Sequence, residues 1–168
     1  MRNVMLVCAL LASVPAVAAG NPACDAPEFR QFDFWVGDWD LSWTTGGKPQ
    51  KGRNTVTSIL NGCVVAESFR SGPPEGFDGI SHSTWDREAR QWKQTWVDNT
   101  GAYLDFTGGW EDGKMVLARD AEKDGKRIRQ RMVFHEIGKD ALKWNWESSG
   151  DAGRTWKVLW QIDYARRK

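Results

Sequence analysis

The sequence predicts an all-β protein, a single antiparallel up-and-down β-barrel of about 8–10 strands with a short helix before the first strand. Apolar and polar residues alternate with a period of two along most of the chain after residue 38, as in the segments 91–97, 128–134 and 156–164. Dipeptides that favour tight hairpin turns, such as Asp112-Gly113 and Asp124-Gly125, separate these segments. Consecutive strands joined by hairpins lose their exposed edges when the sheet closes into a barrel.

The first 19 residues have the pattern of a cleaved export signal. Arg2 precedes an apolar run from Val4 to Val17, and small residues end this run. A retained membrane anchor is the alternative, but the run contains Pro15 and is shorter than the roughly 20 residues of a spanning helix. We therefore expect a signal peptide over residues 1–19, one β-barrel domain over residues 20–168, and an exported mature protein that is periplasmic or secreted.

The charge of the mature chain argues against two classes of partner. Loss of Arg2 with the signal leaves as many basic residues as acidic ones, 22 of each, so the mature protein is formally neutral. Nucleic acids and anionic membranes attract proteins with a basic surface. We expect no nucleic-acid partner and no stable membrane insertion, and the oligomeric state is left open.

The cysteine content agrees with export. Cys8 lies in the predicted signal, so the mature chain keeps Cys24 and Cys63. Because disulfides persist in exported compartments, we predict a bond between these two residues that ties the N-terminal segment to the barrel. Two free thiols, one of them buried in a strand, are the alternative.

A short string at the start of the first predicted strand resembles a known signature. Residues 32–39 read Phe-Asp-Phe-Trp-Val-Gly-Asp-Trp and follow a short helix expected over residues 26–32. Gly37 and Trp39 resemble the Gly-x-Trp signature of the lipocalin and calycin superfamily, and the wider string resembles exported bacterial barrel proteins. The resemblance implies a lipocalin-like barrel that holds small molecules. It also implies that Trp39 closes the narrow end of the barrel beneath a basic side chain, Arg166 or Arg167.

The residues that resemble motifs for catalysis, metal binding or cofactor binding occur singly in this sequence and form no complete motif. Segment 149–156 resembles one Asp-box hairpin of a sialidase-type propeller, but a propeller needs many blades, so we predict a structural hairpin. The only histidines, His82 and His135, lie about fifty residues apart and outside the last two strands, where some barrels of the lipocalin superfamily ligate haem. We expect no metal and no cofactor, and we expect His135 to point outward.

The candidate site consists of polar and aromatic side chains that the alternation places on apolar faces. Buried polar groups need partners, so Glu67 and His82 form a candidate acid–base pair that could be catalytic, with Gln94 and Gln130 orienting a ligand. Tryptophan accounts for 11 of 168 residues, and its large rings either fill a barrel or wall a cavity. The predicted ligand-binding residues are Trp43, Glu67, His82, Trp92, Gln94, Trp96, Gln130 and Trp144.

Three functions are compatible with this pattern, and we favour the first. It is an exported lipocalin-like protein that binds a small apolar or aromatic molecule inside a tryptophan-lined barrel. The second is a barrel enzyme that uses Glu67 or His82 in acid–base chemistry. The third is a filled barrel, in which the polar residues satisfy one another and the outer surface contacts another exported protein.

Overall fold

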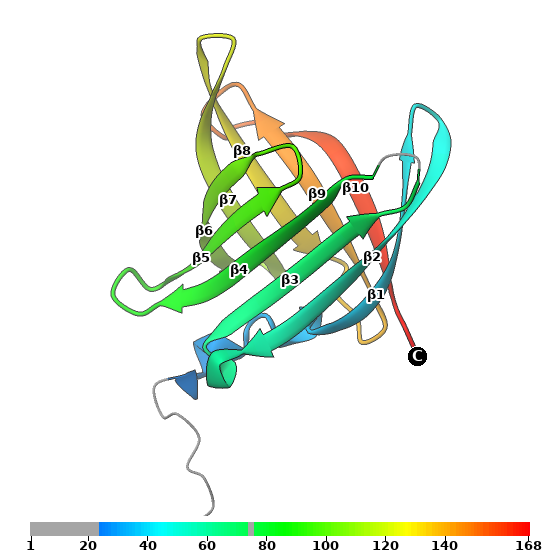
Figure 1. Ribbon diagram of the computed structural model, residues 1–168. Helices are drawn as coiled ribbons and strands as arrows, with labels where there is room; N and C mark the ends of the chain where they lie inside the picture. The colour runs from blue at the N-terminus through cyan, green and yellow to red at the C-terminus, as the bar shows by residue number, and fades with distance from the viewer. Residues whose placement is uncertain (1–23, 74–75) are drawn as a thin grey trace, which may run out of the picture.

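Ten antiparallel strands close into one barrel (Figure 1). The computed structural model describes residues 24–73 and 76–168, so the predicted signal peptide and Cys8 lie outside the described residues. The strands follow one another in chain order around the barrel, and β1 pairs with β10 to close it. The predicted all-β up-and-down barrel is confirmed. The strands are β1 (Gly37–Thr45), β2 (Lys48–Ile59), β3 (Val64–Ser71), β4 (Asp78–Asp86), β5 (Gln91–Asp98), β6 (Tyr103–Glu111), β7 (Lys114–Lys123), β8 (Lys126–His135), β9 (Ala141–Ser149) and β10 (Lys157–Arg166).

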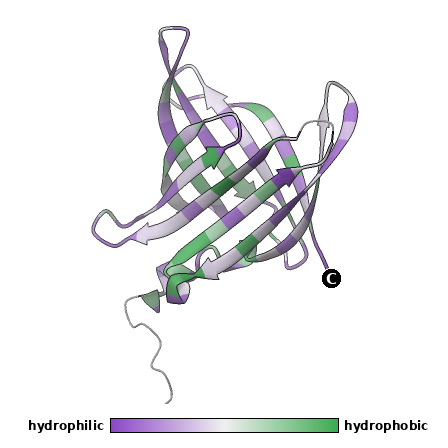
Figure 2. Ribbon diagram, viewed as in Figure 1, coloured by the Kyte–Doolittle hydropathy of each residue, from purple (hydrophilic) through white to green (hydrophobic). Residues whose placement is uncertain are grey.

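The alternation of side chains explains why these segments form strands. In β1 the side chains of Trp39, Leu41 and Trp43 are buried, and the residues between them are exposed. Apolar and polar colours accordingly alternate along the strands in Figure 2. The turns at 112–113 and 124–125 have positive φ at both central residues, as the tightest hairpin turns require. The dipeptides predicted to be turns therefore connect strands.

Two short 3-10 helices, η2 (Pro27–Arg30) and η3 (Asp33–Trp35), lie at the lower end of the barrel in Figure 1. They replace the single helix expected over residues 26–32. Phe32 lies between them and is fully buried, with its ring centroid 4.7 Å from that of Trp92 and 5.6 Å from that of Phe134. Its burial closes this end of the barrel with aromatic rings.

The Gly-x-Trp segment packs against the end of β10. The Arg166 guanidinium lies over Trp39, 4.1 Å from the ring centroid, and donates hydrogen bonds to the carbonyls of Val36 at 2.8 Å and Phe34 at 2.9 Å. Gly37 has a φ of +140°, and a Cβ atom there would collide with Nη1 of Arg166. The expected contact with Trp39 is thus present, and of the two candidates it is Arg166 that makes it.

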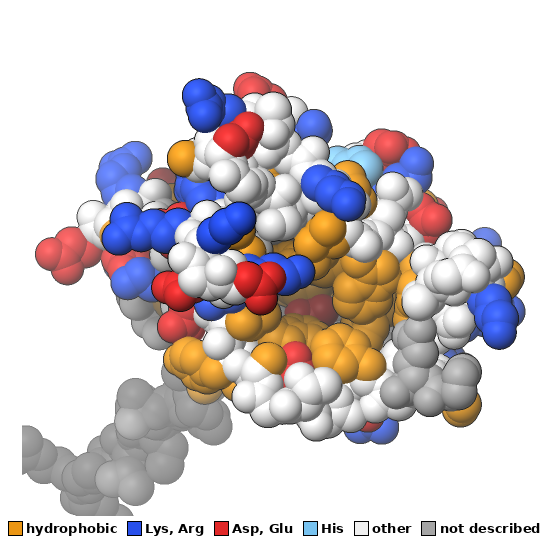
Figure 3. All heavy atoms as spheres, turned by 90° about the horizontal axis from the view of Figure 1, so that it is seen from above, with side chains coloured by type: hydrophobic (Ala, Val, Ile, Leu, Met, Phe, Trp, Pro, Cys, Tyr) orange, Lys and Arg blue, Asp and Glu red, His pale blue; other side chains and the backbone are white. Residues whose placement is uncertain are grey.

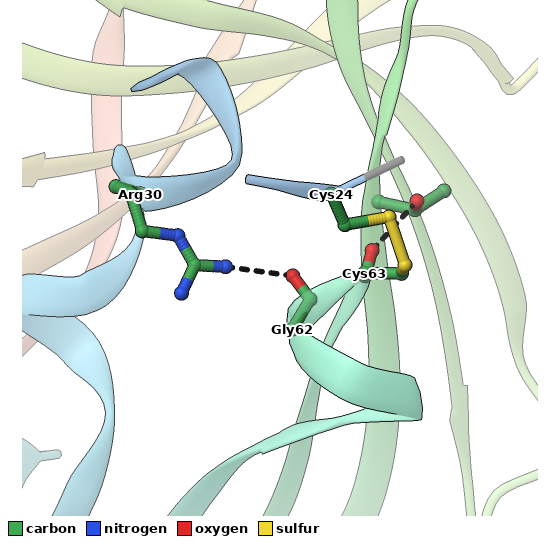
Figure 4. Close-up of a disulfide and its surroundings, with 5 residues drawn as sticks. Cys24, Arg30, Gly62 and Cys63 are labelled. Atoms are coloured by element: carbon green, nitrogen blue, oxygen red, sulfur yellow. Dashed lines mark hydrogen bonds between the residues drawn. A yellow bond between two sulfur atoms is a disulfide. The ribbon is translucent and has the colours of Figure 1, made fainter. Parts of the chain in front are cut away.

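A disulfide joins the N-terminal segment to the barrel (Figure 4). It links Cys24 to Cys63, 39 residues later and directly after the short helix η4 (Leu60–Gly62). Beside it, Arg30 donates a 2.7 Å hydrogen bond to the carbonyl of Gly62. The predicted bond is confirmed, and the alternative of two free thiols is wrong.

Segment 149–156 forms the connection between β9 and β10. The Asp151 carboxylate accepts hydrogen bonds from the Thr155 hydroxyl at 2.6 Å and from the Ser149 hydroxyl at 2.7 Å. Hydrogen bonds stabilise the ionised carboxylate and lower the pKa of Asp151 to about 2, and the largest contribution comes from Thr155. This is the structural hairpin that was predicted. Trp156, however, packs on the guanidinium of Arg131, 4.0 Å from its ring centroid, and not in the barrel core.

Candidate functional site

A cavity of about 280 Å³ lies inside the barrel. Seen from above, the upper end of the barrel is hollowed, and the hollow is lined mainly by hydrophobic side chains with basic side chains near its rim (Figure 3). At the opposite end lie η2 and η3 (Figure 1), with the buried rings of Phe29, Phe32 and Trp35. The interior therefore contains a pocket at the hollowed upper end, with buried aromatic rings at the other end. Its tryptophans are Trp35, Trp96, Trp144, Trp146 and Trp160, and its phenylalanines are Phe69, Phe77, Phe106 and Phe134.

Two of the four tryptophans in the predicted ligand-binding set, Trp96 and Trp144, line the cavity. Trp43 is buried outside the lining, with its ring 5.5 Å from that of Trp160. Trp92 is also buried outside it and donates a 3.0 Å hydrogen bond to the side chain of Gln31. Both share the inward phase of their strands, so alternation correctly placed them inside. Alternation does not indicate the level along the barrel axis, which decides whether an inward side chain reaches the cavity.

The predicted ligand-binding set leaves out three tryptophans of the cavity wall. Trp146 and Trp160 share an inward phase with apolar neighbours on their strands, but alternation alone does not separate cavity residues from other inward residues. Trp35 belongs to η3, where no strand alternation applies. Trp110 shares the inward phase of Leu104 and Phe106 on β6, but it lies near the end of the strand and is 45 % exposed.

Glu67 projects from the middle of β3 into the cavity wall. The Asn54 amide on β2 donates a 2.7 Å hydrogen bond to its Oε1, and the Ser81 hydroxyl on β4 donates a 2.6 Å bond to its Oε2. Burial penalises the charged carboxylate more than these two bonds favour it, and it raises the pKa of Glu67 from 4.5 to about 7. The cavity therefore contains a carboxyl group that exchanges a proton near neutral pH.

Tyr164 extends this network to β10. Its hydroxyl accepts a 3.2 Å hydrogen bond from the Asn54 amide, and its side chain lines the cavity beside Glu67. Burial and the nearby Glu67 charge raise the pKa of Tyr164 well above its usual value, so the phenol stays protonated. Three residues that the sequence did not single out, Asn54, Ser81 and Tyr164, thus surround the one carboxyl that it did.

His82 points away from the cavity, so the predicted pairing of His82 with Glu67 is wrong. Along β4 the exposed residues include Ile80 and His82, whereas Ser81 and Ser83 are fully buried. The prediction took the face that carries Ile80 as the inner one. In the barrel that face is outside, and the small polar residues face inward.

The residues on the inner face of β4 have small side chains, because side chains from neighbouring strands occupy the space above them and form hydrogen bonds with them. A Cβ at Gly79 would collide with the Trp96 indole, which occupies that position from β5. Ser83 accepts a 2.8 Å hydrogen bond from the amide of Gln94, the predicted polar residue that does line the cavity. Hydrophobicity alone therefore assigned the wrong face to this strand.

Gln130 lies in the inward phase of β8 but outside the cavity lining. Its side-chain oxygen accepts a 3.0 Å hydrogen bond from Arg119 on β7.

His135, expected to point outward, is partly buried, with its Nδ1 3.6 Å from Glu136. The described part of the chain holds no group of three His, Cys, Asp or Glu residues that could bind a metal ion. Within the same residues, no helix is long and apolar enough to cross a membrane.

Comparison with known families covers almost the whole barrel. The family model described as "Protein of unknown function (DUF1579)" matches residues 26–166. The chain belongs to the DUF1579 family. No curated protein matches the sequence. In this DUF1579 protein the matched range includes all ten strands, the cavity wall and the hydrogen-bond network around Glu67.

Proposed function

We propose that this DUF1579 protein is an exported lipocalin-like protein that binds a small apolar or aromatic molecule in its cavity. The observation that carries the proposal is the aromatic-lined cavity of about 280 Å³ inside the barrel, where the upper end is hollowed. Ligand pockets are typically concave, mostly apolar and supplied with a few convergent polar groups. Such a cavity argues against the filled barrel that would act only through its outer surface.

The cavity residues divide into two roles. Trp96 and Trp144 offer flat faces against which an aromatic or alicyclic ligand stacks. Glu67 and Gln94 supply polar contacts that orient it, and both are held in place by hydrogen bonds from or to neighbouring strands. His82 has no part in this arrangement, because it faces outward.

Two features outside the cavity support the lipocalin-like and exported parts of the proposal. The stacking of Arg166 on Trp39 is the contact that the Gly-x-Trp resemblance implies. The disulfide between Cys24 and Cys63 is of the kind that persists in oxidising compartments. Intact-mass measurement of the protein from its native host tests export directly, since we expect the chain to begin after residue 19.

Native mass spectrometry of the same preparation tests binding. A co-purified small molecule that is released by mild denaturation would support the proposal and identify the ligand's chemical class. Titration with phenylnaphthylamine, an uncharged aromatic dye, adds an independent measurement, and we expect saturable one-to-one binding that quenches tryptophan emission. Absence of both a bound molecule and saturable dye binding would refute the proposal.

A barrel enzyme is the second candidate, and one observation favours it. Glu67 lies in the cavity wall with its pKa raised to about 7, close to the value that suits general acid–base catalysis at neutral pH. We expect any such activity to disappear in Glu67→Gln while the fold is kept. Incubation of the co-purified molecule with both proteins, followed by mass spectrometry, detects conversion; equal conversion would exclude Glu67 as the catalytic group.

A further inference from the structure

Arg119 places a positive charge inside the upper part of the barrel. It follows Met115 and Leu117 in the inward phase of β7, and both of those side chains are fully buried. Because β7 runs toward the hairpin at the open end, Arg119 lies nearer the mouth than these two residues (Figure 1). Its guanidinium lies over the ring of Phe106, 5.9 Å from the centroid, and Phe106 is part of the cavity wall.

The guanidinium is fixed by an uncharged partner. Arg119 and Gln130 are directly opposite each other in the β7–β8 pair, and Nη1 of Arg119 donates a 3.0 Å hydrogen bond to the Gln130 side chain. Within residues 24–73 and 76–168 no carboxylate forms an ion pair with Arg119. On the outer face of β8, by contrast, Arg129 pairs with Asp120 and Arg131 with Glu147.

The acidic residues of the cavity wall are already engaged elsewhere. Asp98, at the end of β5, accepts hydrogen bonds from the Trp96 indole and from Thr100. Glu67 accepts bonds from its two neighbouring strands. Among the described residues, Gln130 is the only hydrogen-bond acceptor found for the Arg119 guanidinium, which has five N–H donors. Arg119 is not itself part of the cavity lining, but its guanidinium lies over the lining residue Phe106.

We propose that Arg119, oriented by Gln130, is the anion-binding residue at the mouth of the cavity. The inference rests on the proposed function and specifies its ligand class: an anionic amphiphile whose apolar body enters the aromatic cavity and whose carboxylate or other oxyanion stays at the mouth. A planar guanidinium binds oxyanions through two parallel hydrogen bonds, and the partly desolvated setting strengthens them. Gln130, which the sequence pattern predicted to orient a ligand, acts here as a positioning residue.

A pair of dyes that share one aromatic body tests the proposal. Anilinonaphthalene sulfonate carries an anionic group, and phenylnaphthylamine has the same ring system without it. Both are titrated into the full mature protein and into Arg119→Gln. We expect the preference for the anionic dye, defined as the ratio of the two dissociation constants, to fall at least about tenfold in Arg119→Gln.

Arg127→Gln is the matched control, because Arg127 is an exposed residue of β8 and its loss changes the net charge equally. We expect it to leave the ratio unchanged, and we expect Arg119→Lys to retain part of the preference. Near-ultraviolet circular dichroism verifies that each variant is folded. An unchanged ratio in Arg119→Gln, or an equal loss of affinity for both dyes, would overturn the role of Arg119.

The outcomes also separate this inference from the proposed function. Saturable binding of the uncharged dye without any preference for the anionic one would leave the cavity as a binding site and remove the anion site. Failure of both dyes to bind the wild-type protein would overturn both proposals. Titration at high salt provides a further measurement, since we expect salt to weaken binding of the anionic dye and to leave binding of the neutral dye unchanged.

Discussion

The hydroxyl of Ser81 donates a 2.6 Å hydrogen bond to the carboxylate of Glu67, directly across the β3–β4 pair. Together with the amide of Asn54, it allows a carboxyl group to occupy the wall of an aromatic barrel. Two bonds do not fully replace water, so the pKa of Glu67 stays raised, at about 7. The stability of the barrel should therefore depend on pH through this one buried residue.

We predict that Glu67 makes the protein less stable as the pH rises from 4.5 through about 7. The folded pKa lies above the unfolded value, so in this window the folded state binds more protons than the unfolded state. The contribution of Glu67 is complete below pH 4.5 and is lost as the carboxyl ionises, a difference of roughly 3 kcal/mol. Urea unfolding across this pH range measures it.

The matched variant is Glu67→Gln, whose neutral amide can still accept from Asn54 and can donate to Ser81. Its free energy of unfolding should vary less with pH than that of the wild type over the same window. Glu122→Gln, at an exposed position of β7, controls for the loss of a carboxylate. Parallel pH profiles for wild type and Glu67→Gln would contradict the prediction.

We predict that Gly37→Ala destabilises the protein by about 1–3 kcal/mol. The new Cβ would displace the guanidinium of Arg166 from Trp39, and the φ of +140° is unfavourable for any side chain. Gly109→Ala is the control, because a Cβ there has open space. Denaturant unfolding compares the two, and equal small effects would show that the close approach at Gly37 is not required.

The sequence was sufficient for the architecture because the barrel repeats one local rule. Buried Trp39, Leu41 and Trp43 alternate with exposed residues, and two-residue turns at 112–113 and 124–125 set the hairpins. The disulfide followed from the number of cysteines left after the predicted signal. Each of these features depends on residues close in sequence, or on the absence of any alternative partner.

The site was only partly predictable, because it depends on which side chains meet across strands. Glu67 and Gln94 were identified as polar residues on inward faces, but their partners Ser81 and Ser83 belong to a strand whose inner face is not apolar. The same strand carries Ile80 outside, and this reversed the assignment of His82. Arg119 was not singled out either, since only the register with Gln130 shows where it lies.

We predict that removal of the disulfide lowers the free energy of unfolding by about 2–4 kcal/mol. The bond closes a loop between residues 39 positions apart, Cys24 and Cys63, and so restricts the unfolded chain. The double variant Cys24→Ser/Cys63→Ser should unfold at lower urea than the wild type. Reductant should lower the free energy of unfolding of the wild type to that of the variant and leave the value of the variant unchanged. A further decrease in the variant would show that the reductant acts elsewhere.

We predict that Leu104→Trp weakens binding of phenylnaphthylamine about tenfold or more by filling the cavity. Leu104 lies in the cavity wall on β6, where a larger ring takes space that the dye would occupy. Tyr103→Trp is the control, because Tyr103 is the preceding residue of the same strand and is 63 % exposed. Dye emission measures both affinities, and circular dichroism verifies the fold. Undiminished binding to a folded Leu104→Trp would place the dye outside the barrel and would remove the cavity as the binding site.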